Sequence, residues 1–132
     1  MTFKLSTRSL RRLDGVHPQL ALVVQEAIKI TTVDFSVVQG VRTLAEQKKL
    51  FMLGKSKTMA SRHLPHGPNL YSHAVDLCGW VNGTVSWATE DYAPIADAMK
   101  SAAYQLGIPL EWGGDWKWVD MPHFQLSWKE YP

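Results

Sequence analysis

Residues suited to metal binding stand in two segments far apart in this chain, so they can act together only in a fold that brings the segments side by side. The first segment runs from Ser61-Arg62-His63 to Ser72-His73-Ala74-Val75-Asp76, and the second is Asp120-Met121-Pro122-His123. A catalytic zinc ion usually takes three protein ligands, often histidines with one carboxylate, and keeps a fourth position open for water. The two segments supply such a set and a further carboxylate, which predicts a mononuclear zinc hydrolase.

The composition indicates one globular domain. The chain has 132 residues, of which 45% are hydrophobic and 20% charged, and it is long enough to bury a core without disulfides. We therefore expect a single domain over residues 1–132. Cys78 is the only cysteine. Its apolar neighbours predict a buried thiol, and no Cys-His spacing supports a nucleophilic role.

Charge and hydropathy exclude two classes of partner. A net charge of +2 is too small to predict nucleic-acid binding. No segment approaches the roughly 18 apolar residues of a membrane span, and the first residues lack the apolar stretch of a signal peptide. We expect a protein made in the cytoplasm, without stable membrane insertion.

Hydrophobic periodicity and capping residues predict an α+β fold. Helices are expected over residues 6–13, 18–30, 44–53 and 91–106, the third begun by a capping box of Thr43 and Glu46. Strands are expected over residues 35–39, 74–80, 108–112 and 123–126, and a hairpin turn at Asn82-Gly83 leads to a short strand ending at Trp87. The predicted architecture is helices packed on a small antiparallel sheet, with the zinc site at the sheet edge.

Two further segments strengthen the metal-hydrolase interpretation. Gln39-Gly40-Val41-Arg42-Thr43 resembles a Gly-x-Arg-Thr stretch, and Glu111-Trp112-Gly113-Gly114-Asp115-Trp116 resembles a Trp-Gly-Gly-Asp-Trp segment. With the two metal-binding segments, they resemble the zinc D-alanyl-D-alanine carboxypeptidase family. Within that family the likeness is greatest to phage endolysins that cut the L-alanyl-D-glutamate bond of peptidoglycan. The four segments follow the family's order, from about Phe35 to Leu126.

The resemblance implies roles for individual residues. His63, Asp76 and His123 are similar to the family's zinc ligands, and Asp120 is similar to its general base. Arg42 is similar to the arginine that binds substrate and stabilises the oxyanion. Gln39 and Trp118 are expected to contact the substrate. Of the neighbouring Trp112, Trp116 and Trp118, we expect Trp118 to be the most exposed.

The chain departs from the family pattern between His63 and Asp76. An ungapped alignment would place Asn69 at the ligand position, and an amide is a poor zinc ligand. We therefore place an insertion between Leu64 and Ser72, which leaves His63 as the ligand. The Pro and Gly content of this insertion predicts a loop that leaves and rejoins the site.

Several residues keep alternative interpretations. His66 and His73 are further candidate ligands, although each also fits an ordinary loop or strand position. Arg42 can instead form an ion pair with a helix carboxylate, and Asp120 can be a turn former before a proline. Asp115 is a second candidate for the base, although it is better suited to orienting a ligand imidazole.

The resemblance leaves a choice of activity. The same zinc chemistry serves a D-alanyl-D-alanine carboxypeptidase or dipeptidase, and a zinc-dependent wall-binding domain without turnover is a third alternative. For the favoured endopeptidase the expected partner is bacterial peptidoglycan in the periplasm, reached by release through a holin. We expect a monomer and one catalytic peptidase domain, with no separate wall-binding domain.

Overall fold

An antiparallel sheet organises the computed structural model, which describes residues 2–56 and 58–132. Its strands are β1 (Asp34–Gln39), β2 (Ala74–Val81), β3 (Thr84–Ser86), β4 (Leu110–Trp112) and β5 (His123–Leu126). The order across the sheet is β1-β2-β5-β4, and β3 pairs with β2. The helices are α1 (Thr7–Arg12), α2 (Pro18–Ile30), α3 (Leu44–Met52) and α4 (Thr89–Leu106). The predicted α+β class is therefore confirmed.

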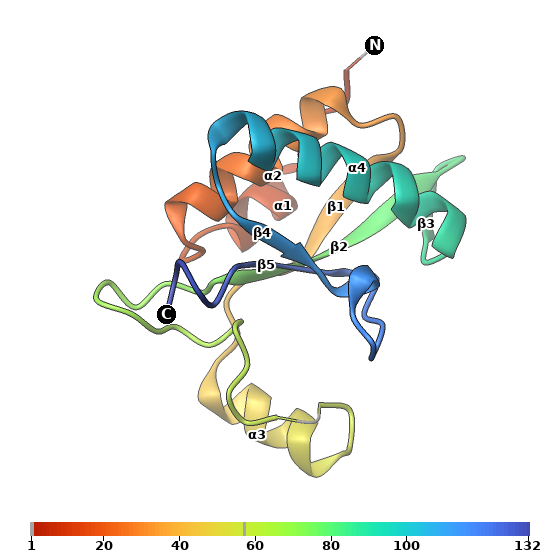
Figure 1. Ribbon diagram of the computed structural model, residues 1–132. Coiled ribbons are helices and arrows are strands. Elements are labelled where there is room, and N and C mark those ends of the chain that lie inside the picture. The colour runs from red at the N-terminus through yellow and green to blue at the C-terminus, as the bar shows by residue number, and fades with distance from the viewer. Residues whose placement is uncertain (1, 57) are drawn as a thin grey trace.

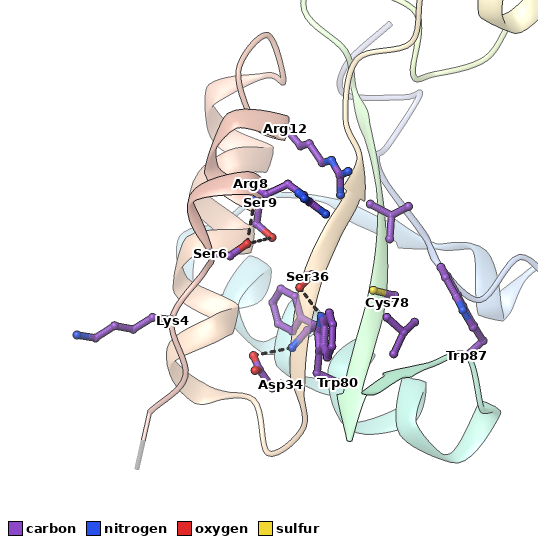
Figure 2. A pocket seen from close by; sticks show the side chains of 13 residues that line it. Lys4, Ser6, Arg8, Ser9, Arg12, Asp34, Ser36, Cys78, Trp80 and Trp87 are labelled. Carbon is purple, nitrogen blue, oxygen red and sulfur yellow. Dashed lines mark hydrogen bonds between the residues drawn. The ribbon is translucent and has the colours of Figure 1, made fainter. Parts of the chain in front are cut away.

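The two faces of the sheet differ in what covers them. Helices α2 and α4 lie together on one face, α1 lies beside β1 at the other face, and α3 stands apart beyond the ends of the strands (Figure 1). Phe35, Val37, Leu77 and Phe124 belong to the buried core that includes α2 and α4. Because side chains alternate along a strand, the residues between them turn to the opposite face. Figure 2 shows part of that face beside α1, where Trp80 donates a hydrogen bond to Ser36.

Local signals set most element boundaries. The side chain of Ser6 accepts a hydrogen bond from the backbone N–H of Ser9 and caps α1. Both hydrogen bonds of the predicted Thr43–Glu46 capping box are present at the start of α3. Asn82 and Gly83 have φ angles of 53° and 78°, as a type I′ turn requires. None of the helices among the described residues is long and apolar enough to cross a membrane.

Several boundaries differ from the sequence prediction by one or two residues. Helix α4 begins at Thr89, not at residue 91. Strand β3 ends at Ser86, not at Trp87, and the Ser86 hydroxyl donates a hydrogen bond to Asp91 in the first turn of α4. Strand β4 begins at Leu110, not at residue 108. Gly107 has a φ of 70° and the Ile108 N–H donates back to the Ala103 carbonyl, so residue 108 still belongs to the cap of α4.

The sheet register brings the two metal-binding segments together. Asp76 on β2 lies opposite His123 on β5 and opposite Gln39 on β1. Gln39 is the last residue of β1 and His123 the first of β5. The candidate site therefore lies at the edge of the sheet where β1 ends and β5 begins. This edge is formed by the ends of strands, as predicted, and the site lies over the central strands β2 and β5.

Candidate metal centre

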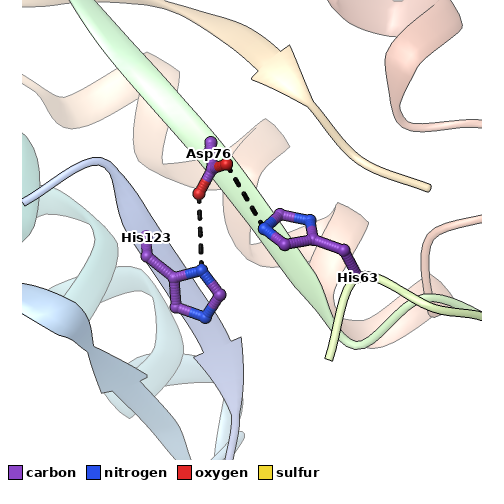
Figure 3. Close-up of side chains that lie close together, drawn as sticks. All are labelled: His63, Asp76 and His123. Atoms are coloured by element: carbon purple, nitrogen blue, oxygen red, sulfur yellow. Dashed lines mark ion pairs between the residues drawn. The ribbon is translucent and has the colours of Figure 1, made fainter. Parts of the chain in front are cut away.

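Three side chains from separate parts of the chain converge beside β2. His63 comes from a loop, Asp76 from β2 and His123 from the start of β5 (Figure 3). Nε2 of His63 lies 3.3 Å from Oδ2 of Asp76, and Nδ1 of His123 lies 3.4 Å from Oδ1 of Asp76. One ligand atom from each residue lies within 4.8 Å of the others. This cluster can bind one metal ion.

Hydrogen bonds fix which imidazole nitrogens are free to bind a metal. Nδ1 of His63 lies 2.8 Å from the Gly40 carbonyl, and Nε2 of His123 lies 2.8 Å from Oε1 of Gln125. Because both partners are acceptors, these nitrogens carry the protons and the other nitrogens present lone pairs. Nε2 of His63 is buried and has no hydrogen-bond partner among the described residues. This is the arrangement of metal-binding histidines, so the donor set fits a metal ion.

Gly40 is required for the backbone to approach α1 closely. A Cβ atom on Gly40 would lie 2.1 Å from the carbonyl oxygen of Arg12. Only glycine avoids this clash, and the Gly40 carbonyl is therefore held where His63 donates to it.

The electrostatics of the cluster favour an ionised carboxylate. Burial acts to raise the pKa of Asp76, but His123 and His63 hold it well below its usual range. Burial acts to lower the pKa of His123, but Asp76 and Gln125 raise it above its usual value. Without a metal ion the ring nitrogen of His123 that faces Asp76 therefore takes up a proton readily, and a bound cation would replace that proton. Asp76 is therefore a charged oxygen ligand at neutral pH.

Replacing Gln125 with leucine is expected to weaken metal binding. The change leaves the Nε2–H of His123 without its acceptor, and loss of such a partner typically lowers metal affinity 10–100-fold. Competition titration with a zinc chelator measures the change. Gln105→Leu, an exposed position on α4, is the matched control. An unchanged zinc affinity in Gln125→Leu would show that this hydrogen bond does not orient the ligand.

Asp120 is held beside the cluster by backbone contacts. Its N–H donates to the Gly113 carbonyl at 2.9 Å, and its carbonyl accepts from the His123 N–H at 3.2 Å. A Cβ atom on Gly113 would lie 2.2 Å from the Asp120 carbonyl oxygen. Burial raises the pKa of Asp120, and nearby Asp76 acts in the same direction. A raised pKa makes this carboxylate a better proton acceptor near neutral pH.

Arg42 is fixed by side chains of two glutamines. Its Nε and Nη2 donate to Oε1 of Gln39 at 3.2 and 2.7 Å, and its Nη1 donates to Oε1 of Gln47 at 2.7 Å. Nη2 also lies 3.9 Å from Oδ2 of Asp76. Among residues 2–56 and 58–132, no helix carboxylate forms an ion pair with Arg42, and Glu46 instead caps α3.

Gln47 is a residue that the sequence analysis did not single out. It is fully buried, and its Nε2 donates to the Ser56 hydroxyl and the Thr58 carbonyl. Gln47 therefore links Arg42 to the segment after α3. No local signal marks it, because a glutamine within a helix is common and its partners lie outside that helix.

The cluster opens into a cleft of about 1020 Å³. Its lining includes Gln39, Arg42, Asp120 and Trp118, together with the three clustered residues. Trp118 is 71% exposed, as predicted. Trp116 packs near the ring of His123, with centroids 5.1 Å apart, whereas Trp112 donates to the Met121 carbonyl.

Asp115 lies on the surface and does not line the cleft. Its carboxylate pairs with Lys100 at 2.7 Å on the surface. The orientation of the His123 imidazole comes from Gln125 instead.

Residues 64–72, where we placed an insertion, form a loop beside the cluster. The His73 N–H donates to the Arg62 carbonyl at 2.8 Å, so this loop leaves and rejoins the fold at neighbouring positions. His66 contacts the Arg62 guanidinium and the Leu64 carbonyl, and its ring lies 3.9 Å from that of His73. His66 and His73 stand outside the three-residue cluster.

Acidification is expected to destabilise the fold through His73. Burial, together with nearby His66, Arg62 and His17, lowers the pKa of His73 from 6.5 to about 4. Between these values the unfolded chain binds more protons than the folded one, so stability falls as the pH falls. The contribution is at most about 1.4 kcal/mol per pH unit. Melting temperatures from pH 7 downward should fall less steeply for His73→Phe than for the wild type; parallel curves would contradict this assignment.

The His-Asp-His set, with two buried histidines and a partly buried aspartate in an open cleft, is the kind of site that metal-dependent hydrolases use. The family model for phage L-alanyl-D-glutamate peptidases matches residues 1–126. The L-alanyl-D-glutamate peptidase of Escherichia phage T5 is 31% identical over 117 residues, which cover 88% of this chain and 83% of that protein. The crystal structure of the Serratia marcescens L-Ala D-Glu endopeptidase ChiX matches with a TM-score of 0.89 and 42% identity, over 99% of this chain and 95% of that one. The chain belongs to the phage L-alanyl-D-glutamate peptidase family.

Proposed function

We propose that this protein is a zinc-dependent endopeptidase that hydrolyses the L-alanyl-D-glutamate bond in the stem peptide of bacterial peptidoglycan. The observation that carries the proposal is the convergence of one nitrogen of His63 and one of His123 on Asp76, while the other nitrogen of each ring is hydrogen-bonded to Gly40 or Gln125. Family membership and the similarity to ChiX support the choice of bond. We assign His63, Asp76 and His123 as the zinc ligands.

The residues around the cluster supply the steps of peptide hydrolysis. A bound zinc ion acts as a Lewis acid and lowers the pKa of water. Asp120 accepts a proton from the attacking water and then donates it to the leaving amine. Arg42, fixed by Gln39 and Gln47, stabilises the negative charge that develops on the scissile carbonyl oxygen. Trp118 forms an exposed wall of the cleft against which the stem peptide packs.

The proposal extends to the biological setting. We propose that residues 1–132 form one catalytic domain that acts as a monomer. Membership of a phage family supports synthesis in the host cytoplasm and release through a holin to the wall in the periplasm.

Mass spectrometry of muropeptides tests the choice of bond. Digestion of purified peptidoglycan with the zinc-loaded protein should release stem peptides with a new N-terminal glutamate. Loss of terminal D-alanine without new N-terminal glutamate would instead show a carboxypeptidase. Unchanged muropeptides, with zinc bound, would indicate a binding domain without turnover.

A further inference from the structure

A second concave surface lies on the sheet face that α2 and α4 leave uncovered. This groove has a volume of about 560 Å³ and lies between α1 and strands β1 to β3. In Figure 2, Arg8 and Arg12 reach from α1 toward the strands, and Trp80 and Trp87 stand farther across. None of these four residues belongs to the candidate metal centre or its cleft.

The groove combines aromatic rings with positive charge. Trp80 is 38% exposed and Trp87 57% exposed, so both offer ring surface to a ligand. Arg8 is exposed. Nη1 of Arg12 donates a hydrogen bond to the Val37 carbonyl at 2.9 Å. Asp34 is the one carboxylate that lines the groove among the described residues. Exposed aromatic rings bury the apolar faces of sugar rings, and guanidinium groups pair with carboxylates in two-point contacts.

The groove and the cleft are joined by one strand. Asp76, Cys78 and Trp80 are alternate residues of β2 and therefore face the same side of the sheet. Asp76 lines the cleft, whereas Cys78 and Trp80 line the groove. At about 3.3 Å per residue, Trp80 lies roughly 13 Å along the strand from Asp76.

This spacing suits the substrate of the proposed function. In peptidoglycan, the L-alanine of the stem is joined to the lactyl group of an N-acetylmuramoyl sugar. The scissile bond is therefore about two residue lengths, or roughly 7 Å, from the nearest sugar ring. A ring on Trp80, at roughly 13 Å, is the next sugar along the glycan strand. Hydrolysis adds water across the L-alanyl-D-glutamate bond, which frees the amine of the glutamate and leaves an L-alanine carboxylate on the glycan. Each cut thus leaves a new carboxylate on the L-alanine of the glycan strand, while the carboxylates of the rest of the stem leave with the released peptide.

We infer that the groove binds the glycan strand on the N-terminal side of the scissile bond, with sugar rings on Trp80 and Trp87 and the L-alanine carboxylate of a cleaved stem on Arg8. This inference rests on the proposed function for the identity of the substrate. A second contact of this kind holds the enzyme on a partly digested strand, because binding at one site raises the effective concentration at the other.

Binding to a synthetic ligand tests the inference without relying on turnover. The ligand is an oligosaccharide of N-acetylglucosamine and N-acetylmuramoyl-L-alanine with a free alanine carboxylate, and its control is the corresponding alaninamide. Calorimetric titration of the zinc-loaded protein should show the carboxylate ligand binding about tenfold more tightly than the amide. Arg8→Ala should remove that difference, whereas Arg11→Ala, an exposed neighbour on α1 outside the groove, should keep it.

The aromatic part of the groove is tested with the same ligands. Trp80→Ala and Trp87→Ala should each weaken binding of both ligands, whereas Tyr104→Ala, which removes an 89% exposed ring on α4, should not. Absence of binding, equal binding of both ligands by the wild type, or binding unaffected by Arg8→Ala and Trp87→Ala would overturn the inference.

Cleavage of a free stem peptide separates this inference from the proposed function. The wild type and the groove variants should all cut a synthetic peptide that begins with L-alanyl-γ-D-glutamate and carries no sugar. Cleavage of the peptide without glycan binding overturns the groove alone. Glycan binding without cleavage by the wild type overturns the endopeptidase assignment and leaves the groove as a glycan-binding surface.

Discussion

Asp120→Asn is expected to lower the turnover of peptidoglycan by about 10²–10⁴-fold, the usual loss when a positioned general base is removed. The substitution keeps the shape of the side chain and the backbone contacts of residue 120 with Gly113 and His123. The variant should therefore fold and bind zinc as the wild type does. Rates of dye release from labelled peptidoglycan, with zinc content measured on the same samples, give both quantities.

Asp115→Asn is the matched control for this experiment. Asp115 lies on the surface in an ion pair with Lys100, so its replacement should leave turnover close to that of the wild type. Parallel loss of zinc and activity in Asp120→Asn would make Asp120 a ligand. Full activity of Asp120→Asn would place the base elsewhere.

His63→Ala is expected to abolish stable zinc binding and, with it, activity. The substitution removes the buried Nε2 that faces Asp76, and two remaining protein ligands are fewer than catalytic zinc sites use. Elemental analysis after dialysis against a weak chelator should find about one zinc per chain in the wild type and almost none in the variant.

His66→Ala tests where the insertion lies. His66 contacts Arg62 and the Leu64 carbonyl and stands outside the cluster, so this variant should retain most of its zinc. Loss of zinc from His66→Ala with retention in His63→Ala would show that the insertion has been placed wrongly.

Residues whose structure depends on near neighbours were predictable from the sequence. Thr43 and Glu46 form their capping box within one helical turn, and Asn82-Gly83 forms its turn from the φ preferences of those two residues. The start of β4 was predicted too early because the apolar Ile108 fits both a strand and the cap of a helix. The hydrogen bond from the Ile108 N–H to the Ala103 carbonyl shows that Ile108 belongs to the cap of α4.

Residues that depend on distant partners were not predictable in the same way. Gln125 orients His123 only because both lie on the same face of β5 beside Asp76. The Gly40 carbonyl meets His63 only because the segment after β1 packs against the end of α1. Both contacts follow from strand register and helix packing, which no short motif encodes. The sequence resemblance picked out the clustered residues but not the groups that hold them.

The location of the metal ion is the most direct test of the account. Crystals of the zinc-loaded protein should show one anomalous difference peak at the zinc absorption edge, about 2.0–2.1 Å from Nε2 of His63 and from Nδ1 of His123, with an Asp76 oxygen completing the protein ligands. A peak at His66 and His73, or the absence of a peak at the three-residue cluster in active, zinc-loaded protein, would contradict the proposed centre.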